Sequence, residues 1–121
     1  MPNCLIVDDS TTIRKIISSY VKRLDFDSDE AENGAEALER CRATMPDAIV
    51  LDWNMPVMNG IEFIRHLRES PGGDKPRVVF CTTESGVAKI VTALDAGADE
   101  YIIKPFDFEM LQSKFALLNM A

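Results

Sequence analysis

Short apolar runs without polar interruptions alternate along this chain with segments whose apolar residues recur at every third or fourth position. The runs predict strands at 4–7, 26–31, 47–52, 77–83 and 100–104. Because most of these runs are continuous rather than alternating, both faces of the strands must be buried, which predicts a parallel sheet between two layers of helices. The run at 26–31 is the most polar, so we expect it at an edge of the sheet.

The periodic segments predict a helix after each strand. They run from Ile13 to Leu24, over 33–45, over 59–70, from Val87 to a left-handed cap at Gly97, and onward from a cap at Asp107. Ser10 or Thr11 can cap the first helix. No repeat or linker interrupts the pattern, so residues 1–121 are expected to form one α/β domain.

The charge balance and the cysteines exclude several classes of protein. Thirteen basic residues against twenty acidic ones give a net charge of −7, which argues against binding nucleic acid or an anionic membrane. No apolar run approaches the roughly eighteen residues that insertion into a bilayer requires. The three cysteines form no Cys-x-x-Cys pair, which predicts reduced thiols in the core of a cytoplasmic protein.

Acidic residues stand where two of the predicted strands end. Asp8 and Asp9 follow the first strand, and Asp52 ends the third. Since the carboxyl ends of parallel strands meet at one edge of a sheet, these carboxylates should lie close together. They would repel one another unless a cation neutralised them, and oxygen ligands without His or Cys favour Mg²⁺ over Ca²⁺. The sequence therefore predicts a magnesium site.

A hydroxyl and an ammonium are expected at the same edge. Thr82, with Thr83 beside it, ends the fourth predicted strand, and Lys104 ends the fifth. An aspartate in such surroundings is suited to accept a phosphoryl group, because the cations and the hydroxyl neutralise the phosphoryl oxygens while a carboxylate oxygen attacks phosphorus. Asp52 is the expected acceptor. Pro105 is a candidate for a cis peptide bond that turns the Lys104 ammonium inward.

Four motifs occur together in register: "DD" at 8–9, "DWNMPVMNG" at 52–60, Thr82, and the pair Lys104-Pro105. Over the whole chain they resemble a response-regulator receiver domain of the CheY-like, single-domain type. The resemblance implies a flavodoxin-like, doubly wound sheet of five parallel strands in the order 2-1-3-4-5, with five helices. It also implies a signalling switch of a two-component system, not an enzyme, which catalyses only its own phosphorylation and dephosphorylation.

The same resemblance implies a set of metal ligands and a phosphoryl donor. Asp9 and Asp52 would bind Mg²⁺ through their side chains, Asp8 through a water molecule and Asn54 through its backbone carbonyl. The donor would be a histidine kinase or a histidine phosphotransfer protein, and small acyl phosphates could substitute for it.

The resemblance further implies how the signal leaves the domain. Thr82 would be drawn toward the phosphoryl group and Tyr101 would move inward with it, so that the face of the fourth helix, fifth strand and fifth helix binds a downstream protein. Asn54 and Glu84 match positions that tune hydrolysis, which implies a short-lived phosphoryl group. The protein would be a monomer, with dimerisation on activation as the alternative.

Two residues depart from the family pattern. Thr83 stands where Ala or Gly is usual, and its branched side chain would narrow the access to Asp52. Asp25 stands where Gly is common after the first helix, and a left-handed Asp costs on the order of 1 kcal/mol.

Other functions require features that differ from those of this chain. Two alternatives to a stand-alone switch remain, because the sequence predicts no output domain after the closing helix. The chain could be a phosphorelay intermediate or one domain of a longer chain. A small metal-dependent phosphotransferase or hydrolase of the haloacid-dehalogenase type would need Asp-x-Asp, whereas Asp8 and Asp9 are adjacent. A nucleotide or flavin binder would need a Gly-rich loop after the first strand. A scaffold that is never phosphorylated would be expected to lose Asp52 or Lys104.

Overall fold

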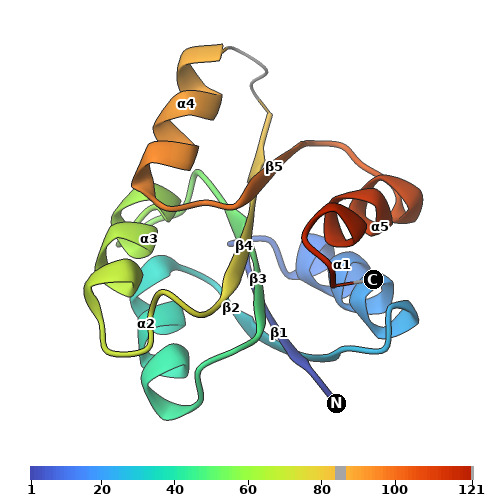
Figure 1. Ribbon diagram of the computed structural model, residues 1–121, viewed down its shortest axis with the longest axis horizontal. Coiled ribbons are helices and arrows are strands. Elements are labelled where there is room, and N and C mark those ends of the chain that lie inside the picture. Colours follow the sequence, from blue (N-terminus) through green and yellow to red (C-terminus); the bar gives the residue numbers. More distant parts are fainter. Residues whose placement is uncertain (84–86, 121) are drawn as a thin grey trace.

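A parallel sheet forms the centre of the computed structural model, which describes residues 1–83 and 87–120 (Figure 1). Its strands are β1 (Asn3–Val7), β2 (Asp27–Ala31), β3 (Ala48–Asp52), β4 (Arg77–Thr82) and β5 (Glu100–Ile103). Every neighbouring pair is parallel, in the order β2-β1-β3-β4-β5, which confirms the predicted flavodoxin-like topology. The carboxyl ends of all the strands therefore lie at one edge of the sheet.

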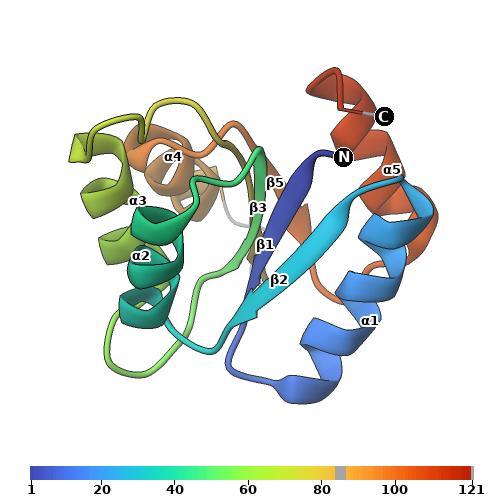
Figure 2. The same cartoon turned by 90° about the horizontal axis from the view of Figure 1, so that it is seen from below.

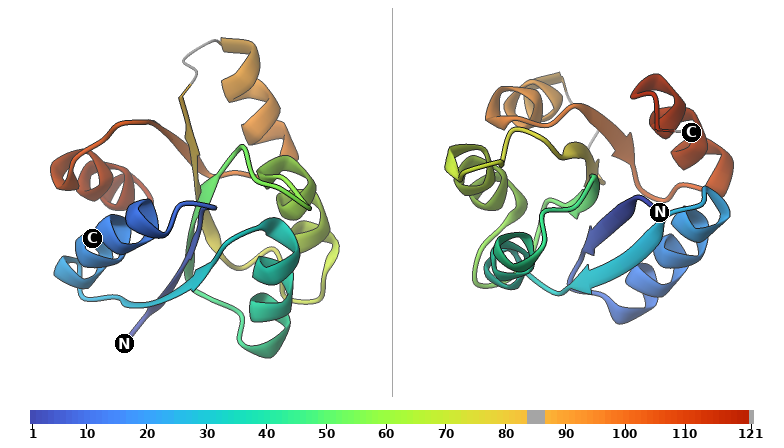
Figure 3. Two further views of the ribbon diagram at one scale, coloured as in Figure 1. Left: turned by 180° about the vertical axis from the view of Figure 1, so that it is seen from behind. Right: turned by 60° about the horizontal axis from the view of Figure 1, so that its bottom comes forward.

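Helices cover both faces of this sheet. They are α1 (Thr11–Arg23), α2 (Gly34–Ala43), α3 (Gly60–Glu69), α4 (Val87–Ala96) and α5 (Phe108–Leu117). Helices α1 and α5 lie on one face, whereas α2, α3 and α4 lie on the other (Figures 2 and 3). Across residues 1–83 and 87–120, each helix is too short or too polar to reach from one side of a bilayer to the other.

The two layers of helices explain the continuous apolar strands. Successive residues of β1 face opposite sides of the sheet, so Leu5 and Val7 join the core beneath α2, α3 and α4. Cys4 and Ile6 join the core beneath α1 and α5. All four side chains are buried, and a strand with burial on both faces has no position for an exposed polar residue.

The polar strand β2 lies at an edge of the sheet, as its composition predicts. It pairs with β1, and Ala31 is the buried residue within it. The strand begins one residue later than predicted because the backbone N–H of Phe26 donates to the carbonyl of Val21 in α1. The Phe26 ring packs against Phe115 of α5 with 5.3 Å between the ring centroids.

The helix termini follow from the capping residues. Ser10, not Thr11, caps α1, since its hydroxyl accepts a hydrogen bond from the backbone N–H of Ile13. The helices predicted at 33–45 and 59–70 are each shorter at both ends. At each start the asparagine is the cap and lies outside the helix, and α2 and α3 end at Ala43 and Glu69. Asp107 caps α5 as predicted.

Left-handed backbone occurs at both positions where the sequence suggests it. Gly97 ends α4 with φ of 124°, and Asp25 follows α1 with φ of 64°. The predicted strands at 77–83 and 100–104 each end one residue early, at Thr82 and Ile103. Lys104 thus follows β5 instead of belonging to it, and its backbone N–H donates to the carbonyl of Thr82 at 2.8 Å.

Candidate functional site

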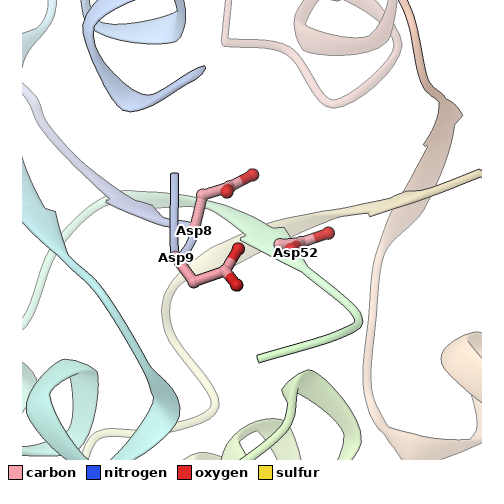
Figure 4. Close-up of side chains that lie close together, drawn as sticks. All are labelled: Asp8, Asp9 and Asp52. Atoms are coloured by element: carbon pink, nitrogen blue, oxygen red, sulfur yellow. The ribbon is translucent and has the colours of Figure 1, made fainter. Parts of the chain in front are cut away.

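Three carboxylates meet at the carboxyl ends of β1 and β3. Asp8 and Asp9 follow β1, and Asp52 is the last residue of β3 (Figure 4). One oxygen from each of the three lies within 4.8 Å of the others. Asp8 and Asp52 are buried, with 2% and 9% of their surface exposed, whereas Asp9 is exposed. The cluster is therefore open to solvent on the side of Asp9.

A single ammonium contacts both buried carboxylates. Lys104 Nζ lies 2.7 Å from Asp8 Oδ2 and 3.0 Å from Asp52 Oδ1. The Lys104–Pro105 peptide bond is cis, as expected from the sequence. Residues separated by 52 and 96 positions in the chain are thus joined in one ion-pair network.

The electrostatics of the cluster show an excess of negative charge. Burial raises the pKa of the Asp52 carboxyl above its ordinary value, and Asp8 and Asp9 add to this while Lys104 opposes it. Burial acts to lower the pKa of Lys104, but its hydrogen bonds with Asp8 and Asp52 and their charges outweigh that effect, so this pKa is raised. Within the described cluster, three carboxylates against one ammonium leave two negative charges when all are ionised.

The donor set fits a hard divalent cation. The cluster offers carboxylate oxygens, and neither His nor Cys belongs to it in the described part of the chain. An open cavity of about 400 Å³ beside the cluster is lined by Asp9, Asn54, Met55, Pro56 and Asn59. Asn54 therefore lies at the mouth of the site next to Asp9, where the sequence predicts a backbone ligand.

The sequence profile of the response regulator receiver domain family matches residues 4–116. The chain belongs to this family. The chemotaxis protein CheY1 of Helicobacter pylori is 40% identical to this receiver domain over 116 residues, which are 94% of each chain. The CheY homologue of Campylobacter jejuni is 40% identical over 112 residues, covering 91% of this chain and 86% of the relative.

Solved structures of receiver domains have the same fold. The structure of the chemotaxis response regulator CheY4 of Vibrio cholerae has a TM-score of 0.90 and 31% sequence identity, covering 100% of this chain and 99% of the other. The predicted family and fold are therefore confirmed, and the chain is a CheY-like receiver domain of two-component signal transduction.

Thr82 and Thr83, at the end of β4, have different surroundings in this receiver domain. Asp52 pairs with Cys81, so Thr82 lies one residue beyond Asp52 on the neighbouring strand. Thr82 is buried, whereas Thr83 is exposed and lines a cavity beside α1 together with Lys104. Glu84, which the sequence suggests as a residue that tunes hydrolysis, lies outside the described residues.

Tyr101 lies on β5, away from the carboxylate cluster. It pairs with Phe80, and Ile103, two residues further on, pairs with Thr82. Tyr101 is half-buried, and Lys114 Nζ of α5 lies 4.5 Å from the centroid of its ring. The structure thus places Tyr101 on the strand that neighbours the strand of Thr82.

A contact between α4 and the loop after Asp52 was not predicted from the sequence. Lys89 Nζ lies 4.7 Å from the ring centroid of Trp53, and this ring packs edge-on against Phe80 at 5.1 Å. Trp53 follows Asp52 directly and is the only tryptophan, so it can report on the site by fluorescence. No local sequence signal indicates the pair, because its two residues come from separate elements.

Proposed function

We propose that this receiver domain takes a phosphoryl group from a phosphohistidine donor onto Asp52 and is controlled by that modification. The observation that carries the proposal is the contact of Lys104 with two buried carboxylates, Asp8 and Asp52, beside a third. An oxygen–phosphorus bond forms at Asp52 as the nitrogen–phosphorus bond of the donor breaks and its electron pair returns to the imidazole. The donor is a histidine kinase or a histidine phosphotransfer protein.

The neighbouring residues have distinct roles in this proposal. Lys104 neutralises a phosphoryl oxygen, and the Thr82 hydroxyl donates a hydrogen bond to another. Asp9 and Asp52 would hold Mg²⁺ through their side chains, together with Asp8 through a water molecule and Asn54 through its backbone carbonyl. Bound Mg²⁺ supplies further positive charge toward the phosphoryl oxygens.

The proposed output surface is formed by α4, β5 and α5. Helix α4 supports this choice because Val87, Val91 and Leu94 are 76%, 48% and 42% exposed, while Ala93 is its buried residue among those described. Apolar side chains at such spacing form a stripe that a protein partner can cover. In the proposal, Thr82 and Tyr101 couple this surface to phosphorylation.

Further properties complete the proposal. Residues 1–121 act as one receiver domain, a monomer that promotes only its own phosphorylation and dephosphorylation, with hydrolysis tuned by Asn54 and Glu84. Cys4, Cys41 and Cys81 are free and buried, which suits the reducing conditions of the cytoplasm, the compartment that we propose.

The covalent step can be tested with a small acyl phosphate and Mg²⁺. We expect the intact protein to gain the mass of one phosphoryl group, and peptide mapping after reductive trapping to locate it at Asp52. Asp52→Asn should abolish this gain. Asp29→Asn is the matched control. It removes the same charge as Asp52→Asn, but from an exposed residue of the edge strand β2.

Trp53 fluorescence gives an independent measurement of the same site. Its emission should change on addition of Mg²⁺ and again on addition of acyl phosphate, and Asp52→Asn should remove the second change. A phosphoryl group on Ser10 or Thr82, or unchanged phosphorylation of the Asp52→Asn variant, would contradict the proposal.

A further inference from the structure

Arg14 in the first turn of α1 connects the ends of two strands beside the carboxylate cluster. Its Nη1 donates to the backbone carbonyl of Asp8 at 2.7 Å, and its Nε donates to Glu30 Oε1 of β2 at 3.0 Å. Its Nη2 donates to the Thr11 hydroxyl at 3.1 Å. The Arg14 side chain is 12% exposed, and its hydrogen bonds with Asp8 and Glu30 are partly buried.

We infer that Arg14 is a positioning residue that fixes the Asp8–Asp9 peptide, and through it the Asp9 carboxylate, for cation binding. This inference rests on the proposed function of the cluster. A peptide unit is planar, so a hydrogen bond to the Asp8 carbonyl also fixes the direction of the Asp9 N–H and Cα. A rigid guanidinium held at three points defines that direction better than a flexible ammonium could.

Asp9 needs such support more than its neighbours do. The Asp8 carboxylate accepts hydrogen bonds from Ser10 N–H at 2.9 Å and from Lys104, and Asp52 is also held by Lys104. In residues 1–83 and 87–120, the exposed Asp9 carboxylate, which Figure 4 shows beside Asp8 and Asp52, makes none of the hydrogen bonds found for its two neighbours. Its position therefore depends on the backbone that precedes it.

Glu30 orients the guanidinium from the opposite side. Its Oε1 accepts from Arg14, while its Oε2 accepts from Lys15 Nζ at 2.9 Å. The hydrogen bond with Lys15 and then that with Arg14 lower the pKa of Glu30, which therefore stays ionised at neutral pH. The Lys15 side chain is 67% exposed. Its described hydrogen bond is the one to Glu30, and it does not bond to Asp8 as Arg14 does.

Positioning and simple charge predict opposite results for the loss of Arg14. A positive charge near the cluster repels a cation, so its removal should tighten Mg²⁺ binding if Arg14 acts by charge alone. If Arg14 positions Asp9, its removal should weaken Mg²⁺ binding. Groups that orient metal ligands typically contribute about tenfold or more to metal affinity, so we expect a loss of about tenfold for Arg14→Met.

The experiment measures the Mg²⁺ dissociation constant by Trp53 fluorescence and, separately, by the Mg²⁺-dependent increase in the free energy of unfolding in urea. The variants are Arg14→Met, Arg14→Lys and Glu30→Gln, with Lys15→Met as the matched control. We expect Arg14→Met to bind about tenfold more weakly, Glu30→Gln to bind more weakly, and Arg14→Lys to recover part of the affinity. Lys15→Met should match the parent.

The outcomes separate this inference from the proposed function. Parent-like or tighter binding by folded Arg14→Met would overturn the positioning role, while Mg²⁺ binding by the parent would still support the proposed function. Absence of Mg²⁺ binding by the parent would overturn both. If Arg14→Met does not fold, weaker binding by folded Glu30→Gln supports the inference, and parent-like binding overturns it.

Discussion

Replacement of Lys104 by methionine isolates the electrostatic contribution of the ammonium that contacts Asp8 and Asp52. Lys104→Met keeps an unbranched side chain of similar length and removes the charge that lies 2.7 Å from Asp8 and 3.0 Å from Asp52. The carboxylates then repel one another without compensation. For one pair of charged oxygens 4.8 Å apart, this repulsion is about 3.5 kcal/mol at an effective dielectric constant of about 20.

The expected loss of stability is similar in size. Removal of one partner from a buried ion pair typically lowers the free energy of unfolding by about 3–5 kcal/mol, and here the side chains of Asp8 and Asp52 are 3% and 12% exposed. We therefore expect Lys104→Met to lose about 3 kcal/mol at neutral pH. Mg²⁺ should restore part of this loss, because it would replace the missing positive charge.

The stability lost by Lys104→Met should depend on pH in one direction. Burial already raises the pKa of Asp52 in the folded protein, and removal of Lys104 should raise it further. A carboxyl group with a raised folded pKa favours folding at low pH and loses that contribution as pH rises through the folded value. The penalty of Lys104→Met should therefore be largest at neutral pH and become smaller as the solution is acidified.

The assay is urea unfolding at about pH 7.5 and about pH 5, followed by far-UV circular dichroism. Lys15→Met is the control, because the ion pair of an exposed lysine should contribute less than about 1 kcal/mol. A Lys104→Met variant as stable as the parent at neutral pH would refute the electrostatic reasoning. An equal loss in the free energy of unfolding at the two pH values would refute it as well.

Two further substitutions test the support of the site and of the fold. Gly60→Ala should lower the free energy of unfolding by about 1–3 kcal/mol and weaken Mg²⁺ binding, because a Cβ would collide with the Asp52 carbonyl and lie 2.8 Å from Phe80 Cζ; parent-like urea and Mg²⁺ titrations would disprove this. Arg68→Met removes hydrogen bonds to three loop carbonyls and to Asp99, and should cost about 2–3 kcal/mol. Its Mg²⁺ affinity should stay unchanged, since these contacts lie at the amino ends of β4 and β5, and a weaker affinity would show that the contacts act on the site.

The elements that the sequence predicted best are those whose signal is local. Continuous apolar runs located β1, β3 and β4, because burial on both faces leaves no choice of residue class. Polarity located β2 at an edge of the sheet. Termini were less accurate: the segments predicted as helices include Asn33 and Asn59, and each of these residues lies outside its helix as the cap.

The residues of the candidate site were predictable for a similar reason. Asp8, Asp52 and Lys104 each end or follow a strand, and the parallel order brings those ends to one edge whatever the side-chain conformations are. The choice between Thr82 and Thr83 was not predictable in this way. It depends on the direction of each side chain at the end of β4, and of these two threonines only Thr82 is buried.

The order of apolar and polar residues by itself determined the α/β class, the parallel sheet and the group of residues at its carboxyl edge. The tertiary structure alone decided that Lys104 bridges Asp8 and Asp52, and that Arg14 holds the peptide before Asp9. The physical reason is the separation along the chain of the residues that interact. Strand and helix patterns arise between near neighbours in the chain, whereas these contacts join residues on different elements and depend on register, rotamers and backbone direction to within about an ångström.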